Sequence, residues 1–114
     1  MSSRGEREYL VDMREAIQRI QEYTSGLGYD DFLADAKTQD AVIRNIEILG
    51  EAAKRLPASL TSASPDIEWK SIAGMRDKLV HDYFGVNLDI LWDVLNTKLP
   101  PLLARIEGLI PERD

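Results

Sequence analysis

One stretch of the sequence decides the fold: residues 38–56, which read TQDAVIRNIEILGEAAKRL. Apolar residues recur along this stretch at alternating steps of four and three, at Val42, Ile46, Leu49, Ala53 and Leu56. That spacing is typical of a coiled-coil seam. It predicts an amphipathic helix that begins at Asp35 or Thr38 and ends at Leu56, directly before Pro57.

Gly50 lies in the middle of this predicted helix, where glycine costs about 1 kcal/mol relative to alanine. We interpret it as a point of close approach by another helix. Ile43, Ile48 and Ala52 widen the apolar face beyond the seam. A face of that width indicates that more than one neighbouring helix covers it.

The same periodicity predicts a preceding amphipathic helix over residues 4–23. Its expected inward residues are Tyr9 or Leu10, Met13, Ala16, Ile17, Ile20 and Tyr23. Gly26 follows this helix and is suited to a left-handed helix cap. Residues 28–35 form a connector that we expect to carry Phe32 and Leu33 into the core.

After Pro57 we expect a loop at residues 61–64 and then a third helical region over residues 65–84. Ser64 is the expected N-cap of that region, and proline at the next position suits the first turn of a helix. Gly74 lies inside the region. The sequence leaves open whether the region is one kinked helix or a turn followed by a helix.

Asn87 is the expected cap of a fourth helix. Pro100 and Pro101 lack amide hydrogens and therefore kink or restart this helix, and residues 102–110 form a last amphipathic piece. No strand pattern or internal repeat is present. The chain is therefore predicted to be all-α, a bundle of four or five helices running up and down, in a single domain over residues 1–114.

The composition excludes several classes of protein. The chain has 114 residues, 44% of them hydrophobic and 30% charged, as in soluble globular proteins. Without cysteine and with one histidine it offers neither disulfides nor an ordinary zinc site, and we expect no metal and no other cofactor. We find no signal peptide or membrane span and expect a cytoplasmic protein. The net charge of −6 argues against a broad nucleic-acid-coating surface but leaves room for a local basic cleft.

The stretch 74–83, GMRDKLVHDY, holds the single histidine between an arginine and a tyrosine. On an ideal helix Arg76 and Tyr83 lie within about 20° of each other, whereas His81 lies about 140° from Arg76. The three groups therefore do not converge on one straight helix. The helix could unwind near Gly85, the long arginine could reach around, or two copies could share the site. We favour a site shared across a two-fold dimer axis.

These residue types suit RNA cleavage without a metal, which needs a base, an acid and a cation. His81 titrates near neutral pH and can serve as base or acid. Arg76 keeps its charge and binds phosphate oxygens bidentately. Tyr83 can orient either group. We expect Asp77 and Asp82 to raise the pKa of His81, because a nearby carboxylate favours the charged imidazole; NMR titration of wild type and Asp82→Asn tests this.

The sequence resembles the HepT-like branch of the HEPN ribonuclease superfamily, the toxin half of HepT–MntA toxin–antitoxin pairs. The motif Arg-x4-His-x-Tyr is present as Arg76, His81 and Tyr83, with the polar Asp77 directly after the arginine. Supporting segments cover nearly the whole chain: 31–33, 40–45, 50–53, 69–75 and 99–100. The short motif alone has low specificity, but within these segments the match is strong.

The resemblance implies a helical homodimer of the HEPN fold with the motif in a cleft at the dimer interface. It implies a metal-independent endoribonuclease that arrests growth, with Arg76 and His81 as catalytic residues. It also implies that a cognate MntA-like nucleotidyltransferase antitoxin adenylylates the hydroxyl of Tyr83. Added AMP places bulk and negative charge where an RNA phosphate must sit, which is sufficient to block cleavage.

Each motif residue also has a purely structural interpretation. His81 could be a solvated or capping residue near a helix end. Arg76 could belong to a surface ion pair, with Asp77 of another chain or with Glu68, of small energetic value. Tyr83 could be a core aromatic residue whose hydroxyl finds a partner.

Two other functions remain open from the sequence. One is a non-catalytic, nucleotide-binding or adaptor HEPN protein that serves its nucleotidyltransferase partner. The other is a bundle whose dimer surface is purely structural, in which Arg76 and His81 can be replaced without a phenotype. Growth arrest that depends on His81 distinguishes the nuclease from both.

Overall fold

The computed structural model describes residues 5–80 and 87–111, and every regular element in these ranges is helical. In chain order the elements are α1 (Glu6–Thr24), α2 (Tyr29–Leu33), α3 (Ala36–Lys54), α4 (Ala58–Ala63), α5 (Trp69–Ala73), α6 (Met75–Val80), α7 (Leu88–Asp93), the π-helical segment η1 (Val94–Lys98) and α8 (Leu99–Leu109). The all-α prediction is confirmed. No helix in these ranges is long and apolar enough to cross a membrane.

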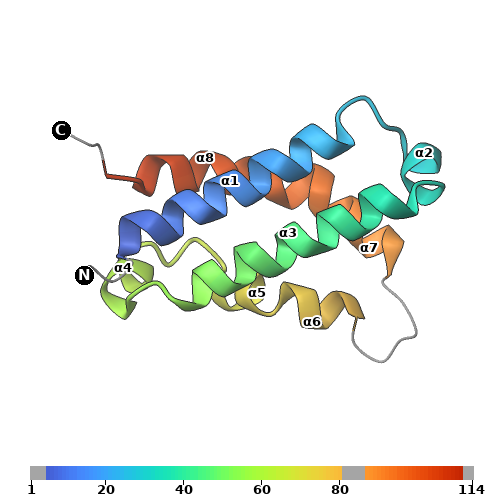
Figure 1. The fold of residues 1–114 in the computed structure, drawn as a ribbon. Coiled ribbons are helices and arrows are strands. Elements are labelled where there is room, and N and C mark those ends of the chain that lie inside the picture. Colours follow the sequence, from blue (N-terminus) through green and yellow to red (C-terminus); the bar gives the residue numbers. More distant parts are fainter. Residues whose placement is uncertain (1–4, 81–86, 112–114) are drawn as a thin grey trace.

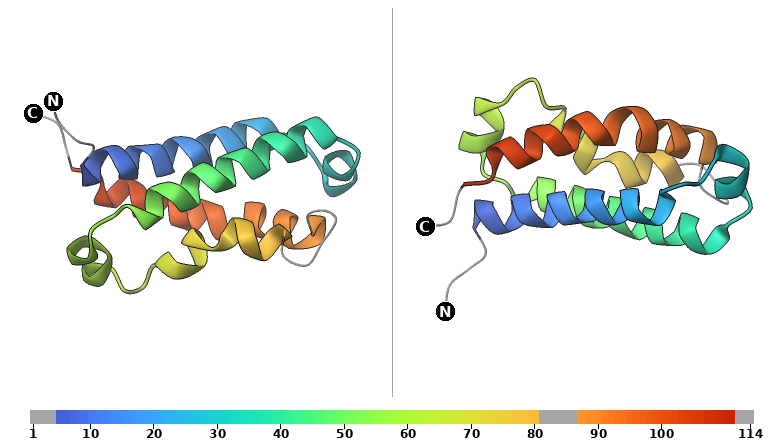
Figure 2. Two further views of the ribbon diagram at one scale, coloured as in Figure 1. Left: turned by 60° about the horizontal axis from the view of Figure 1, so that its bottom comes forward. Right: turned by 90° about the horizontal axis from the view of Figure 1, so that it is seen from above.

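The described elements form four arms that run alternately up and down (Figure 1). The first arm is α1, the second is α3, the third is α5 with α6, and the fourth is α7, η1 and α8. The short helices α2 and α4 lie at opposite ends of the bundle. The left view of Figure 2 shows α3 between α1 and the third arm, and α3 contacts both.

The buried core follows the predicted seam of α3. Val42, Ile46 and Leu49 are at most 1% exposed, and Ala53 and Leu56 are also buried. The seam packs against α1, whose buried residues are Leu10, Met13, Ala16, Ile17 and Ile20. Burial of a large aliphatic side chain contributes roughly 1.5–3 kcal/mol. The α1–α3 pair is therefore the stable base of the fold.

Two residues that were expected to face inward are exposed instead. Tyr23 is 40% exposed and Leu33 is 39% exposed. Each lies in the last turn of its helix, at the end of the bundle, where the helical face no longer meets a long neighbouring arm. Phe32, by contrast, is fully buried, with its ring centroid 5.2 Å from that of Trp92. The prediction for the connector is confirmed for Phe32 and wrong for Leu33.

Several predicted helix ends are confirmed by their hydrogen bonds. Gly26 follows α1 with a φ of 78°, the left-handed conformation that glycine adopts without strain. Asp35 caps α3: its carboxylate accepts bonds from the Thr38 amide (3.0 Å) and hydroxyl (2.6 Å), and these bonds lower the pKa of Asp35. Asn87 caps α7 by accepting a hydrogen bond from the Ile90 amide.

The segment between α4 and α5 corrects the prediction for Ser64 and Pro65. A short helix, α4, occupies part of the expected loop, and Ser64 ends it instead of opening the next helix. The Ser64 carbonyl accepts hydrogen bonds from the Ile67 amide (3.2 Å) and from Nε1 of Trp69 (3.0 Å). These bonds close a turn that buries Ile67, so the following helix begins only at Trp69.

The fourth arm changes its helical pitch just before its two prolines. Because Pro100 and Pro101 have no amide hydrogen, the carbonyls four residues earlier lose their α-helical donors. The arm adapts with a π-helical turn, in which the Leu99 amide donates to the Val94 carbonyl, five residues back. The predicted restart is confirmed, and α8 then carries the fully buried Ile106.

Candidate functional site

The third arm carries the described part of the Arg-x4-His-x-Tyr motif. It consists of two helices of 5 and 6 residues that meet at Gly74, so the region is a pair of short helices and not one kinked helix. Helices of this length are not stable alone in water. The position of the arm therefore depends on its contacts with α3 and with the fourth arm.

Gly50 sets the register between α3 and the third arm. A β-carbon at this position would lie 3.2 Å from the carbonyl oxygens of both Ile72 and Ala73, which confirms the predicted close approach. The two arms run antiparallel. The residue three positions before Gly50 therefore faces the residue three positions after Ala73. This register brings Glu47 opposite Arg76.

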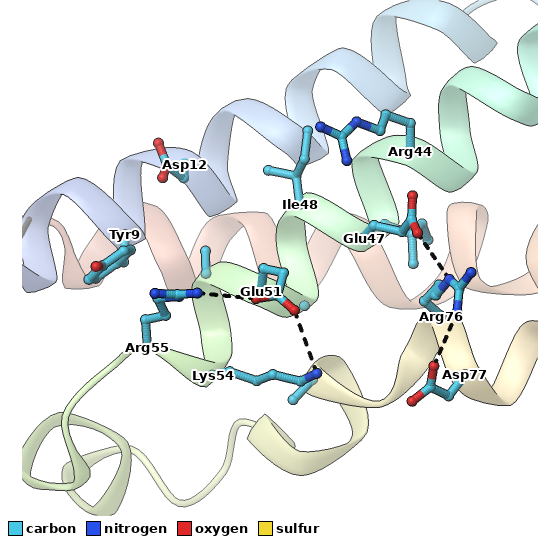
Figure 3. Close-up of a pocket in the computed structure, with 14 residues that line it drawn as sticks. Tyr9, Asp12, Arg44, Glu47, Ile48, Glu51, Lys54, Arg55, Arg76 and Asp77 are labelled. Atoms are coloured by element: carbon cyan, nitrogen blue, oxygen red, sulfur yellow. Dashed lines mark hydrogen bonds and ion pairs between the residues drawn. The ribbon is translucent and has the colours of Figure 1, made fainter.

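Arg76 pairs with two carboxylates of its own chain (Figure 3). Its Nε lies 3.0 Å from Oε2 of Glu47, and its Nη1 lies 3.5 Å from Oδ1 of Asp77. The Arg76 side chain is 50% exposed. Arg76 therefore does form surface ion pairs, but its partners differ from those expected. It pairs with Glu47 of α3 instead of Glu68, and with Asp77 of its own chain.

A groove of about 530 Å³ runs along the outer face of α3, between α1 and the third arm. Its charged lining residues are Asp12, Arg44, Glu47, Glu51, Lys54, Arg55, Arg76 and Asp77. Four of these eight are basic and four are acidic, so the groove is not a continuous basic track. Any anion that enters meets local cationic groups, of which Arg76 is one, instead of a broad positive field.

Ion pairs within the groove differ in what they connect. Glu51 interacts with Lys54 (3.7 Å) and Arg55 (3.6 Å), which lie one turn further on, at the end of α3. Exposed pairs of this spacing contribute only tenths of a kcal/mol. The pair between Glu47 and Arg76 is shorter and joins two arms, so it is the contact that positions a motif residue.

The segment before the third arm is fixed to α8. Asp66 accepts two hydrogen bonds of 2.8 Å from the guanidinium of Arg105, a bidentate arrangement. This contact holds the pKa of Asp66 below its usual range and raises that of Arg105. Together with the Trp69–Ser64 bond, it fixes where the third arm begins.

The predicted site residues divide at the end of α6. Arg76 and Asp77 lie in its first turn and line the groove. His81, Asp82 and Tyr83 follow directly in the sequence but lie outside the described residues. Within residues 5–80 and 87–111, no three His, Cys, Asp or Glu side chains are grouped closely enough to hold a metal ion.

Sequence reasoning missed Glu47 as the partner of Arg76. The two residues lie 29 positions apart, and nothing in their local patterns links them. A signal was nevertheless present in Gly50, because a glycine used for close approach on α3 restricts which helix faces Glu47, one turn away. The contact between Glu47 and Arg76 follows only when the register of Gly50 against Ala73 is known, and the structure supplies that register.

Comparison with known proteins agrees over most of the chain. Residues 13–109 match the family described as "Ribonuclease HepT-like". The chain is 45% identical to a "Probable ribonuclease HepT" of Thermococcus cleftensis, over 93% of this chain and 96% of that protein. It is 41% identical to a "Putative RNase" of Methanocaldococcus jannaschii, over 98% of this chain and 93% of that protein. No solved structure matches the chain.

Proposed function

Because the chain belongs to the HepT-like ribonuclease family, we propose that it is a toxin that cleaves RNA by metal-independent chemistry centred on Arg76 and His81. It is a ribonuclease. We further propose which residues are catalytic, that a second copy of the chain completes the site, and that a partner protein inhibits cleavage.

The observation that carries the proposal is the placement of Arg76. Its guanidinium is half-exposed, lines a groove of about 530 Å³ and is held on one side by Glu47. An arginine in this position can bind the scissile phosphate and stabilise the charge that develops on the phosphorane. Asp77, next to it in the groove, is the expected supporting residue.

His81 is the proposed general acid–base. Cleavage requires one group to take the proton of the 2′-hydroxyl and another to protonate the leaving oxygen. A histidine that titrates near neutral pH performs either step. Two copies of the chain supply two histidines, which divide the two roles between them.

The proposed assembly is a homodimer with the motif at its interface. One feature of the monomer supports it: a second cavity, of about 490 Å³, lies between the third and fourth arms. Its apolar lining includes Met75 of α6, the helix that carries Arg76, and also Ile90, which is 39% exposed. A second copy that covered this surface would remove apolar area from water next to the motif.

The proposed regulator is a cognate nucleotidyltransferase that transfers AMP to the hydroxyl of Tyr83. The added phosphate brings negative charge to the motif, and the added nucleoside brings bulk. Both oppose the entry of an RNA phosphate. Tyr83 lies two residues from His81 in the sequence, so its modification would act at the catalytic motif.

The test is RNA cleavage in EDTA by purified wild type and His81→Ala, with and without prior treatment by the neighbouring nucleotidyltransferase and ATP. Mass spectrometry of the treated protein locates any added AMP. We expect cleavage by wild type alone, and its loss both in His81→Ala and in wild type with AMP on Tyr83. Equal cleavage by wild type and His81→Ala contradicts the proposal and indicates a contaminating nuclease. No cleavage of any RNA, with retained nucleotide or partner binding, favours the adaptor.

A further inference from the structure

The ion pair between Glu47 and Arg76 is unlike its neighbours in the groove. At 3.0 Å it is shorter than the Glu51–Lys54, Glu51–Arg55 and Arg76–Asp77 pairs of the same groove, which measure 3.5 to 3.7 Å. It also joins α3 to α6, whereas the others join residues at most four positions apart in the sequence. Both partners are partly exposed, at 50% and 35%, and ion pairs of that exposure contribute little to stability.

The atoms involved show what this pair does to the guanidinium. Glu47 binds Arg76 through Nε, which lies on the side edge of the planar group. With Nε engaged by Glu47, the end edge with Nη1 and Nη2 is left to bind a phosphate through two parallel hydrogen bonds. Asp77 reaches Nη1 only at 3.5 Å, and its own side chain is 76% exposed. An incoming phosphate can displace this long, exposed contact.

We propose that Glu47 is a positioning residue for RNA cleavage: it holds Arg76 by Nε so that the Nη1–Nη2 edge faces the scissile phosphate. This inference rests on the proposed function of Arg76. The guanidinium plane pivots about a long, flexible side chain, and a second fixed point removes most of that freedom before the substrate arrives. The register set by Gly50 places the carboxylate where it can supply that point.

Glu51 provides a matched control on the same helix. It lies one turn from Glu47, lines the same groove and carries the same charge. Its partners are Lys54 and Arg55 at the end of α3, at i+3 and i+4. Glu51→Gln therefore removes the same negative charge from the groove without releasing Arg76.

The experiment measures kcat and KM for RNA cleavage in EDTA with wild type, Glu47→Ala, Glu47→Gln and Glu51→Gln. A misplaced catalytic group costs about 10- to 100-fold, so we expect kcat to fall by that factor in Glu47→Ala. Glu47→Gln retains an oxygen acceptor for Nε and should fall between Glu47→Ala and wild type. In all three variants KM should stay the same or decrease, because each removes a charge that repels RNA. Glu51→Gln should retain the kcat of wild type.

A purely structural role for Glu47 predicts a different pattern. Stability measured by urea unfolding would then fall with activity, and the kcat of the folded fraction would equal that of Glu51→Gln. That result overturns the inference. Arg76→Ala separates the inference from the proposed function. If Arg76→Ala cleaves as well as wild type, the proposed function fails; if it is inactive while Glu47→Ala retains full kcat, only the role of Glu47 fails.

Discussion

α1 and α3 are continuous helices of 19 residues each, whereas the third arm is divided into helices of 5 and 6 residues. Ten apolar residues of α1 and α3 are buried, against Ile72 and Leu79 among residues 69–79 of the third arm. The third arm instead carries Arg76 and Asp77, the described motif residues that line the groove. A short, weakly buried arm placed against a long, well-packed pair can present reactive groups without contributing much to stability.

This difference predicts that substitutions in the two regions have opposite consequences. Changes inside the α1–α3 pair should lower the free energy of unfolding and leave the chemistry of folded molecules intact. Changes at the third arm should lower activity with little loss of stability. The contact at Gly50, where the two regions touch, should affect both.

The largest effect on stability is expected from Leu49→Ala. Leu49 is fully buried in the seam, and deletion of such a side chain costs about 2–5 kcal/mol through lost transfer energy and a residual cavity. Urea unfolding measures the loss, and Ile90→Ala, at a residue that is 39% exposed, is the control with a smaller cost. RNA cleavage per folded molecule should equal that of wild type. A stable Leu49→Ala protein that cleaves poorly would contradict the division between the regions.

A smaller effect, on both properties, is expected at Gly50. Gly50→Val places a branched side chain against the carbonyls of Ile72 and Ala73, and overpacking of this kind costs about 1–3 kcal/mol. The third arm must shift, which changes the register of Glu47 and Arg76 and should lower kcat. Gly108→Ala is the control: no atom lies within 4 Å of the added carbon, so it should stabilise by about 0.5–1 kcal/mol and leave cleavage unchanged. Unchanged stability and kcat in Gly50→Val would show that the close approach does not set the register.

The smallest effect is expected from the cap of α3 and depends on pH. The hydrogen bonds from Thr38 lower the folded pKa of Asp35 below its usual value of 3.8. The carboxylate therefore stabilises the fold fully above pH 3.8, and this contribution is lost as the pH falls through the lower, folded value. Asp35→Asn keeps a capping side chain but cannot titrate. Its melting temperature should drop less than that of wild type between pH 6 and pH 3, and an equal drop would show that the cap does not titrate with folding.

Much of the scaffold could be predicted from the sequence because local rules determine it. The four-and-three spacing identified five buried seam residues, the last of which, Leu56, follows α3 directly. Side-chain chemistry identified the cap at Asn87, and the start of α3 was predicted at Asp35 or Thr38. Errors occurred where burial elsewhere in the chain overrides a local signal. Ser64 was expected to be an N-cap but lies in a turn instead. The Ser64 carbonyl accepts a hydrogen bond from Nε1 of Trp69, and the turn buries Ile67.

The candidate site could be predicted only in part, for a different reason. Arg76 and Asp77 were identified from a motif that is contiguous in the sequence, and both line the groove. Glu47 belongs to another helix, and its role follows from a register that depends on one backbone contact at Gly50. The roles of His81, Asp82 and Tyr83 stay predictions, because these residues lie outside the described ranges.

The measurement that tests the central claim most directly is made on Arg76→Ala, with RNA cleavage in EDTA and urea unfolding determined on the same preparation. The Arg76 side chain is half-exposed, so its removal should leave the unfolding curve nearly unchanged. Loss of a group that stabilises transition-state charge typically costs about 100- to 1,000-fold in kcat, and we expect a loss of that size. Wild-type cleavage by a fully folded Arg76→Ala protein would contradict the claim that the third arm carries the chemistry.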